Sequence, residues 1–191
     1  MRRRDTLRAF LGIGLWWPIA RSAKSAEEAA NLPPQENDVF VFAFGDREGE
    51  IIAPEDVTVD APQVFAYPMD PLTRVVRSGT RLNQVLLIRV DSAGFSEETR
   101  SRSAADIVGY SAVCTHTGCD VTDWDAETRR FQCPCHDSQF DPADGARVVG
   151  GPAPWQLASL PLKLEGGVLA AAGEFVGRVG FQQPGTDPFG F

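Results

Sequence analysis

The sequence predicts an all-β fold, and two observations support this prediction. Nearly all apolar runs are roughly four to eight residues long and rich in Val, Phe and Leu, and they end at Gly, Pro, Asn or Asp. Only residues 96–106, SEETRSRSAAD, have a composition that suits a helix, and it suits a loop equally well. The chain also has no internal repeat.

The expected strands follow one another with turn residues between them. The run QVLLIRV at 84–90 is the strongest candidate for a buried strand, and IVGYSAV at 107–113 leads directly into Cys114. The other expected strands lie at 39–44, 63–68, 74–76, 129–132, 146–149, 159–164, 167–172 and 174–181. Together they belong to one domain, because about 165 residues are enough to form a core.

The N-terminal segment predicts an export signal. Three arginines at 2–4 precede an apolar run of 12 residues at 9–20. A membrane span needs about 20 apolar residues, whereas a signal peptide needs about 7–15. Residues 3–8, RRDTLR, resemble the twin-arginine export box, although Thr6 stands where an aromatic residue is usual. We therefore assign residues 1–26 to a twin-arginine-type export signal, with an uncleaved short anchor as the alternative.

Loss of this signal would leave a strongly acidic protein. Residues 1–26 carry six bases and one acid, so the net charge moves from −8 to −13. This argues against nucleic acid as a partner, whose affinity depends on Lys and Arg that neutralise phosphate. An acidic surface favours basic partners, as electron carriers often need, although solubility would explain it equally well. Two prolines and a polar composition predict a linker at 27–38, and residues 183–191 form an irregular tail.

All four cysteines and both histidines lie in two short loops at strand ends. Loop 1 is CTHTGC at 114–119, and loop 2 is CPCHDSQFD at 133–141. Two disulfides would leave the grouping of the histidines with the cysteines unexplained. A structural zinc site has suitable ligands, but its pairs are usually spaced Cys-x2–4-Cys and His-x3–5-His rather than Cys-x-His. These two alternatives stand beside a third, an iron–sulfur centre.

The pattern Cys-x-His followed by Cys-x-x-His resembles the Rieske [2Fe–2S] family, in which two histidines replace two cysteines on one iron. The resemblance implies one such cluster as cofactor. It implies that Cys114 and Cys133 bind one iron as thiolates. It also implies that His116 and His136 bind the other iron as neutral imidazoles.

The two remaining cysteines resemble those of the disulfide-bearing branch of the family. The resemblance therefore implies a disulfide between Cys119 and Cys135, and an oxidising compartment suits such a bond. The fold it implies is a Rieske-type antiparallel β-sandwich over residues 39–182. A small cluster-binding subdomain, at about 111–154, is expected as an insertion.

Three positions in loop 2 are expected to tune the cluster. Ser138 stands where high-potential relatives have a serine that donates a hydrogen bond to the cluster. Phe140 stands where those relatives have a tyrosine, and Asp137 replaces the usual glycine beside His136. Both of these differences should lower the reduction potential.

Residues 150–155, GGPAPW, resemble the proline-rich third loop of the cytochrome bc-type members, and we call them loop 3. Gly151, Pro152 and Pro154 are then expected to form an apolar lid that keeps water from the cluster. An ordinary Pro/Gly turn is the alternative.

The resemblance implies one-electron transfer as the iron–sulfur subunit of an exported oxidoreductase, in the periplasm or on the periplasmic face of the inner membrane. DIVGYSAVCTHTGC, Phe140 and EFVGRVG resemble the small subunit of arsenite oxidase, which we favour. Ser138 and GPAP resemble the iron–sulfur subunit of quinol–cytochrome c oxidoreductase, which is the alternative. A zinc-stabilised binding module is the alternative from another class.

The chain offers no evident substrate chemistry of its own. No histidine remains for the mononuclear iron of a Rieske oxygenase. The expected partners are a larger catalytic subunit, containing molybdenum or cytochrome b, and a c-type cytochrome as acceptor. Membrane contact is expected only through an uncleaved N-terminus.

Overall fold

The computed structural model describes residues 19–181. Two α-helices and three 3-10 helices accompany eleven strands in these residues. The helices are α1 (Ile19–Ala30), η1 (Pro54–Asp56), η2 (Arg81–Asn83), η3 (Ser92–Gly94) and α2 (Glu97–Ser101). The strands are β1 (Val39–Phe42), β2 (Val64–Met69), β3 (Val85–Arg89), β4 (Ile107–Ser111), β5 (Asp123–Asp125), β6 (Arg130–Cys133), β7 (Ser138–Asp141), β8 (Arg147–Gly150), β9 (Ser159–Leu160), β10 (Leu162–Glu165) and β11 (Val168–Ala171).

Seven strands form a large antiparallel sheet in the order β10-β11-β1-β2-β3-β4-β9. Its two edge strands, β9 and β10, are separated only by Pro161, so the sheet closes on itself like a barrel. The side chains of β3 alternate between two cores, as the period of a strand requires: Leu86 and Ile88 enter one, and Val85 and Leu87 enter the other. The predicted all-β antiparallel fold is confirmed.

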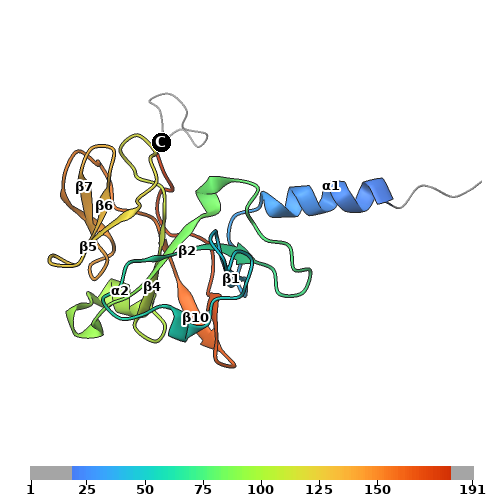
Figure 1. Cartoon of the computed structure of the whole chain (residues 1–191), viewed down its shortest axis with the longest axis horizontal. Helices are drawn as coiled ribbons and strands as arrows, with labels where there is room; N and C mark the ends of the chain where they lie inside the picture. The colour runs from blue at the N-terminus through green and yellow to red at the C-terminus, as the bar shows by residue number, and fades with distance from the viewer. Residues whose placement is uncertain (1–18, 182–191) are drawn as a thin grey trace, which may run out of the picture.

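The other four strands form a small sheet, β5-β6-β7-β8, inserted between β4 and β9. Figure 1 shows this sheet at one side of the molecule and α1 projecting from the other. The small sheet shares a core with the large one, because Tyr110 of β4 packs edge-on against Phe131 of β6. The Tyr110 hydroxyl donates to the carbonyl of Pro142 at 2.8 Å, and burial raises the pKa of this tyrosine above its usual value. The two sheets therefore form one rigid support.

The stretch at 96–106 contains a single helical turn, α2. Ser96 caps it, since its hydroxyl accepts the N–H of Thr99 at 3.3 Å. The Thr99 hydroxyl in turn accepts the N–H of Gly145 at 2.8 Å. This segment thus ties the loop between β7 and β8 to the large sheet.

The small sheet contains two strands that the sequence did not predict, β5 and β7. β5 is three residues long and acidic, and β7 lies within loop 2, so neither has an apolar run of its own. Conversely, the run at 74–76 provides only an isolated bridge between Met69 and Val76. Pairing in these places depends on neighbouring strands rather than on local composition.

The segment between α1 and β1 is held to the body by Arg77. Its guanidinium donates to both carboxylate oxygens of Asp38, from Nε at 2.5 Å and from Nη2 at 2.9 Å, and both side chains are buried. Nη1 donates to the carbonyl of Ala29, and Asn83 donates to the carbonyl of Leu32 at 2.7 Å. The stretch expected as a linker, 27–38, therefore starts inside α1 and is bonded to the large sheet.

Most of the predicted export signal and the whole predicted tail fall outside the described residues, at 1–18 and 182–191. Within residues 19–181 no helix has the length and apolar character that a membrane crossing requires.

Replacing Arg77 with methionine leaves the Asp38 carboxylate buried without its partner. We expect the free energy of unfolding to fall by about 3–5 kcal/mol, because a buried charge is then uncompensated. Urea denaturation followed by circular dichroism measures this loss. Arg47→Met is the matched control, since Arg47 is 47% exposed and its partners Glu50 and Asp56 are 58% and 21% exposed, against 7% for Arg77 and 2% for Asp38; its effect should be much smaller. Equal losses of unfolding free energy in the two variants would contradict a special role for the buried pair of Arg77 and Asp38.

Candidate metal centre

Loop 1 leaves the end of β4 and is closed by backbone hydrogen bonds. The N–H of Cys114 donates to the carbonyl of Cys119 at 2.8 Å, and the N–H of Gly118 donates to the carbonyl of Cys114 at 3.1 Å. An isolated bridge between Val113 and Asp120 continues the pairing at its base. The loop is therefore a tight hairpin with Cys114 buried at its base and His116 partly exposed near its tip.

Loop 2 turns between β6 and β7, where Cys133 pairs with Ser138. The N–H of Asp137 donates to the carbonyl of Cys133 at 3.0 Å. Asp137 has a φ of 56°, a conformation that aspartate tolerates better than most residues. Its carboxylate accepts a hydrogen bond from Gln132 at 2.9 Å. This turn presents His136 at the surface above the buried Cys133.

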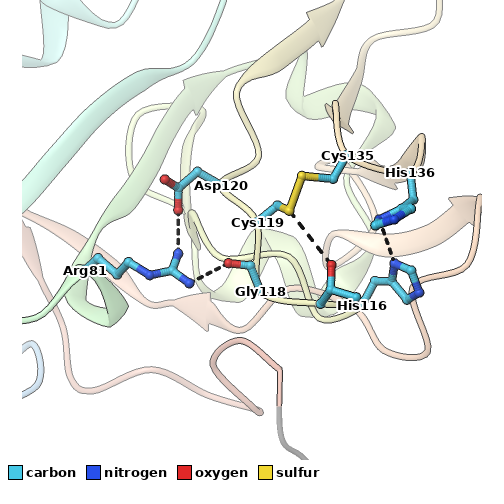
Figure 2. Close-up of a disulfide and its surroundings, with 8 residues drawn as sticks. Arg81, His116, Gly118, Cys119, Asp120, Cys135 and His136 are labelled. Carbon is cyan, nitrogen blue, oxygen red and sulfur yellow. Dashed lines mark hydrogen bonds and ion pairs between the residues drawn. A yellow bond between two sulfur atoms is a disulfide. The ribbon is translucent and has the colours of Figure 1, made fainter.

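The two loops bring their predicted ligands together. Cys114 and Cys133 are both buried free thiols, 1% exposed each. The Nδ1 atoms of His116 and His136 lie 3.2 Å apart, with the ring planes at 88° to one another. Figure 2 shows both rings on the same side of loop 1. The two loops therefore supply two buried thiols and two paired imidazoles, the donor types of a mixed sulfur and nitrogen site.

The Cys133 thiol is held in its protonated form when no metal is bound. Burial raises the pKa of the Cys133 thiol to about 11; the N–H of Cys135 opposes this shift and the neighbouring Cys114 thiol adds to it. A metal that binds Cys133 must therefore displace its thiol proton. Soft thiolates together with imidazoles suit iron–sulfur centres and zinc.

A disulfide joins Cys119 of loop 1 to Cys135 of loop 2 (Figure 2), across a sequence separation of 16 residues. The sulfur atoms of Cys119, Cys133 and Cys135 all lie within 4.8 Å of one another. Two of these sulfurs are bonded to each other and are not thiolates, so they do not bind metal. In this group only Cys133 is free to act as a ligand, and the second thiolate must come from Cys114.

Loop 3 is bonded to both ligand loops, as expected of a lid. The N–H of Ala153 donates to the Ser138 hydroxyl at 3.1 Å, and the Thr115 hydroxyl donates to the carbonyl of Trp155 at 2.5 Å. The guanidinium of Arg178 lies 5.6 Å from the centre of the Trp155 ring, within range of a cation–π interaction. Pro152 and Pro154 are exposed.

Gly151 is the position in loop 3 that only glycine suits. Its φ is 77°, and an added Cβ would lie 2.5 Å from both the carbonyl oxygen of Asp137 and the Cα of Ser138. The lid can approach loop 2 this closely only without a side chain here.

The remaining predicted tuning positions differ in their surroundings. Ser138 and Phe140 are completely buried, and Phe140 packs into the core shared by the two sheets. Asp137 is exposed beside His136. The structure also places three residues at the site that the sequence did not assign to it: Arg81, Thr115 and Trp155. Arg81 bonds to Gly118 from 37 residues away, and no local pattern could have identified it.

A family model, curated relatives and a solved structure that are similar to this chain carry the name Rieske. The family model described as the Rieske [2Fe-2S] domain matches residues 74–161. The chain is 34% identical over 135 residues to the cytochrome bc1 complex Rieske iron-sulfur subunit of Streptomyces lividans, a match that covers 69% of this chain and 79% of that protein.

Two other relatives are matched over less of their own length. Identity is 41% over 113 residues with the putative respiratory nitrate reductase subunit Rieske of Haloferax mediterranei, covering 58% of this chain and 49% of that protein. Identity is 40% over 104 residues with the cytochrome bc1 complex Rieske iron-sulfur subunit of Corynebacterium glutamicum, covering 51% of this chain and 26% of that protein. The chain thus spans half or less of the length of these two proteins.

Among solved structures, the chain resembles the cyanobacterial plasma membrane Rieske protein from Synechocystis. The TM-score is 0.34 at 26% sequence identity, with 46% of this chain and 75% of that chain covered.

Replacing Gly151 with alanine tests the close approach of the lid to loop 2. Gly49→Ala is a matched control, because Gly49 has a φ of 80° and nothing lies within 4 Å of an added Cβ. Both variants are strained by the backbone conformation, but only the first adds a steric clash. We expect Gly151→Ala to lose about 1–3 kcal/mol more of the free energy of unfolding than the control. Equal losses in Gly151→Ala and Gly49→Ala would contradict the close packing of loop 3 against loop 2.

Proposed function

The chain belongs to the Rieske [2Fe–2S] family, and from this we propose that Cys114, Cys133, His116 and His136 hold its cluster. We propose further that the chain is the electron-transfer subunit of a respiratory quinol–cytochrome c oxidoreductase. The observation that carries the ligand assignment is the convergence of two imidazole Nδ1 atoms, 3.2 Å apart, beside two free and buried thiols.

The donor set fits a [2Fe–2S] cluster better than it fits zinc. Cys-x-His followed by Cys-x-x-His is the mixed ligation of the family, in which each loop supplies one thiolate and one imidazole. The structural zinc alternative would leave the disulfide between the two loops without a role at the metal, and its usual ligand spacing is different.

When bound, the cluster supplies one-electron transfer at roughly −150 to +300 mV, against about −400 mV for all-cysteine plant-type clusters. The protein's own groups adjust this value. The Ser138 hydroxyl already accepts the N–H of Ala153, so its hydrogen is free to donate to a sulfur atom. Phe140 has no hydroxyl, and Asp137 adds a negative charge beside His136. We infer a potential below that of relatives with tyrosine and glycine at these positions.

The surrounding structure keeps the ligands in place. Loop 3 is bonded to Thr115, between the two ligands of loop 1, and to Ser138 in loop 2. The disulfide holds the two loops together. A rigid site needs little rearrangement when its charge changes by one electron, and this favours rapid transfer.

The relatives support the quinol–cytochrome c oxidoreductase better than the arsenite-oxidase-like complex that the sequence favoured. The Streptomyces and Corynebacterium relatives, matched over 79% and 26% of their length, are bc1 complex subunits. The Haloferax relative is a putative respiratory nitrate reductase subunit. The proposed partners are accordingly a cytochrome b subunit and a c-type cytochrome acceptor.

We place the protein in the periplasm or on the periplasmic face of the inner membrane. The twin-arginine-like residues 3–8 and the apolar run at 9–20 support export. The disulfide between Cys119 and Cys135 suits an oxidising compartment.

Electron paramagnetic resonance of the dithionite-reduced protein tests the ligand assignment. We expect a rhombic signal whose average g value lies below that of all-cysteine [2Fe–2S] proteins. His136→Ala should abolish this signal, because one imidazole ligand is lost, whereas Thr117→Ala, at an exposed neighbour in loop 1, should retain it. A silent, colourless protein that contains zinc would instead establish a zinc-stabilised binding module.

Composition of the native complex tests the choice of partner. A complex purified through this chain should contain haem b if it is a quinol–cytochrome c oxidoreductase. Metal analysis and the haem absorption spectrum provide the measurement. Molybdenum without haem b would overturn the proposal in favour of the arsenite-oxidase-like complex.

A further inference from the structure

Arg81 contacts loop 1 from outside the small sheet. It lies in η2, just before β3 of the large sheet. Its Nη2 donates to the carbonyl of Gly118 at 2.6 Å, and its Nη1 donates to the carboxylate of Asp120 at 2.7 Å (Figure 2). The planar guanidinium therefore bonds on both sides of Cys119, the disulfide residue of loop 1.

The contact with Gly118 determines how the next peptide group points. All peptide bonds in the described residues are trans, so the carbonyl of Gly118 and the N–H of Cys119 point in opposite directions. Gly118 has a φ of 82°, which glycine adopts readily. With its carbonyl bound to Arg81, the peptide turns the Cys119 N–H away from this arginine.

That direction leads to the ligand side of loop 1. In Figure 2, Arg81 lies on one side of the loop, and His116, His136 and Cys135 lie on the other. Among residues 19–181 no backbone or side-chain acceptor is bonded to the Cys119 N–H. A backbone N–H that faces an iron–sulfur cluster without another acceptor is free to donate to its sulfur. Such hydrogen bonds stabilise the reduced, more negative state and raise the potential.

We propose that Arg81 is a positioning residue of the metal centre, which fixes the Gly118–Cys119 peptide with its N–H toward the cluster and so raises the reduction potential. The proposal rests on the ligand assignment made above. Arg81 acts through loop 1 and does not touch the cluster ligands themselves.

A surface ion pair alone would not have this effect. Arg81 and Asp120 are 53% and 47% exposed, and ion pairs of this kind contribute little to stability. Both side chains are about half exposed, so solvent and salt screen the direct influence of each charge on the cluster. The hydrogen bond to the Gly118 carbonyl is the part that orients the peptide.

Four variants separate positioning from charge. Arg81→Ala removes both the charge and the hydrogen bond, and Asp120→Ala removes the partner charge alone. The double variant Arg81→Ala/Asp120→Ala leaves the net charge unchanged but still lacks the bond to Gly118. Arg47→Ala is a control for loss of a surface arginine whose ion pairs lie elsewhere, with Glu50 and Asp56.

The measurement is the reduction potential of the full-length, cluster-loaded protein, by protein-film voltammetry. We expect Arg81→Ala and the double variant to shift the one-electron equilibrium toward the oxidised state by a similar three- to tenfold, where tenfold is 59 mV for one electron. Asp120→Ala and Arg47→Ala should have little effect. Reduced Arg81→Ala should also show altered g values, because the hydrogen bonding at sulfur has changed.

Two results would overturn the proposal. The first is an Arg81→Ala variant whose reduction potential equals that of the wild type or shifts no more than that of Arg47→Ala. The second is a double variant with the wild-type reduction potential while Arg81→Ala is shifted, because the shift in Arg81→Ala would then result from the lost charge. If Arg81→Ala does not load a cluster, Arg81→Met replaces it, because methionine keeps most of the length of the side chain but has no N–H to donate to the Gly118 carbonyl. A wild-type potential in that variant would also contradict positioning.

Failure of the ligand assignment is distinguishable from failure of this inference. A wild-type protein without the rhombic signal would contradict the ligand assignment. A wild-type protein with that signal, together with unchanged potentials in the variants, would contradict only the role of Arg81.

Discussion

The metal centre depends on one hydrophobic core that runs beneath both ligand loops. Cys114 and Cys133 are members of this core, together with Tyr110 of the large sheet and Phe131 and Phe140 of the small sheet. Because the interior is closely packed, the two thiols cannot move apart without opening a cavity. The loops themselves contain little regular structure, so the position of the ligands is determined by the strands and the packing under them.

Further bonds restrain the loops above this core, and each acts in a different direction. The disulfide between Cys119 and Cys135 connects the loops to each other. Loop 3 bonds to both through Ser138 and Thr115, and Arg81 bonds to the outer side of loop 1. A site restrained from every side changes little when it gains or loses an electron. The histidines are nevertheless left near the surface, where an electron carrier can approach them.

The small sheet, whose strands β6 and β7 carry loop 2 between them, lies at one side of the molecule, and α1 lies at the other (Figure 1). Arg77 and Asn83 bond the segment after α1 to the large sheet. The end of α1 and the cluster-binding loops therefore belong to one body rather than to two parts joined by a flexible linker.

The sequence by itself determined the fold class, the family and the residues of the two ligand loops. Short apolar runs and closely spaced cysteines and histidines are local patterns, and they carry this information without reference to the rest of the chain. The tertiary structure alone decided which distant residues support the loops. Arg81 bonds to a carbonyl 37 residues away, and Thr115 to one 40 residues away, so no periodicity or motif could identify them. Likewise β5 and β7 have no apolar run, and they become strands only because neighbouring strands offer hydrogen-bond partners.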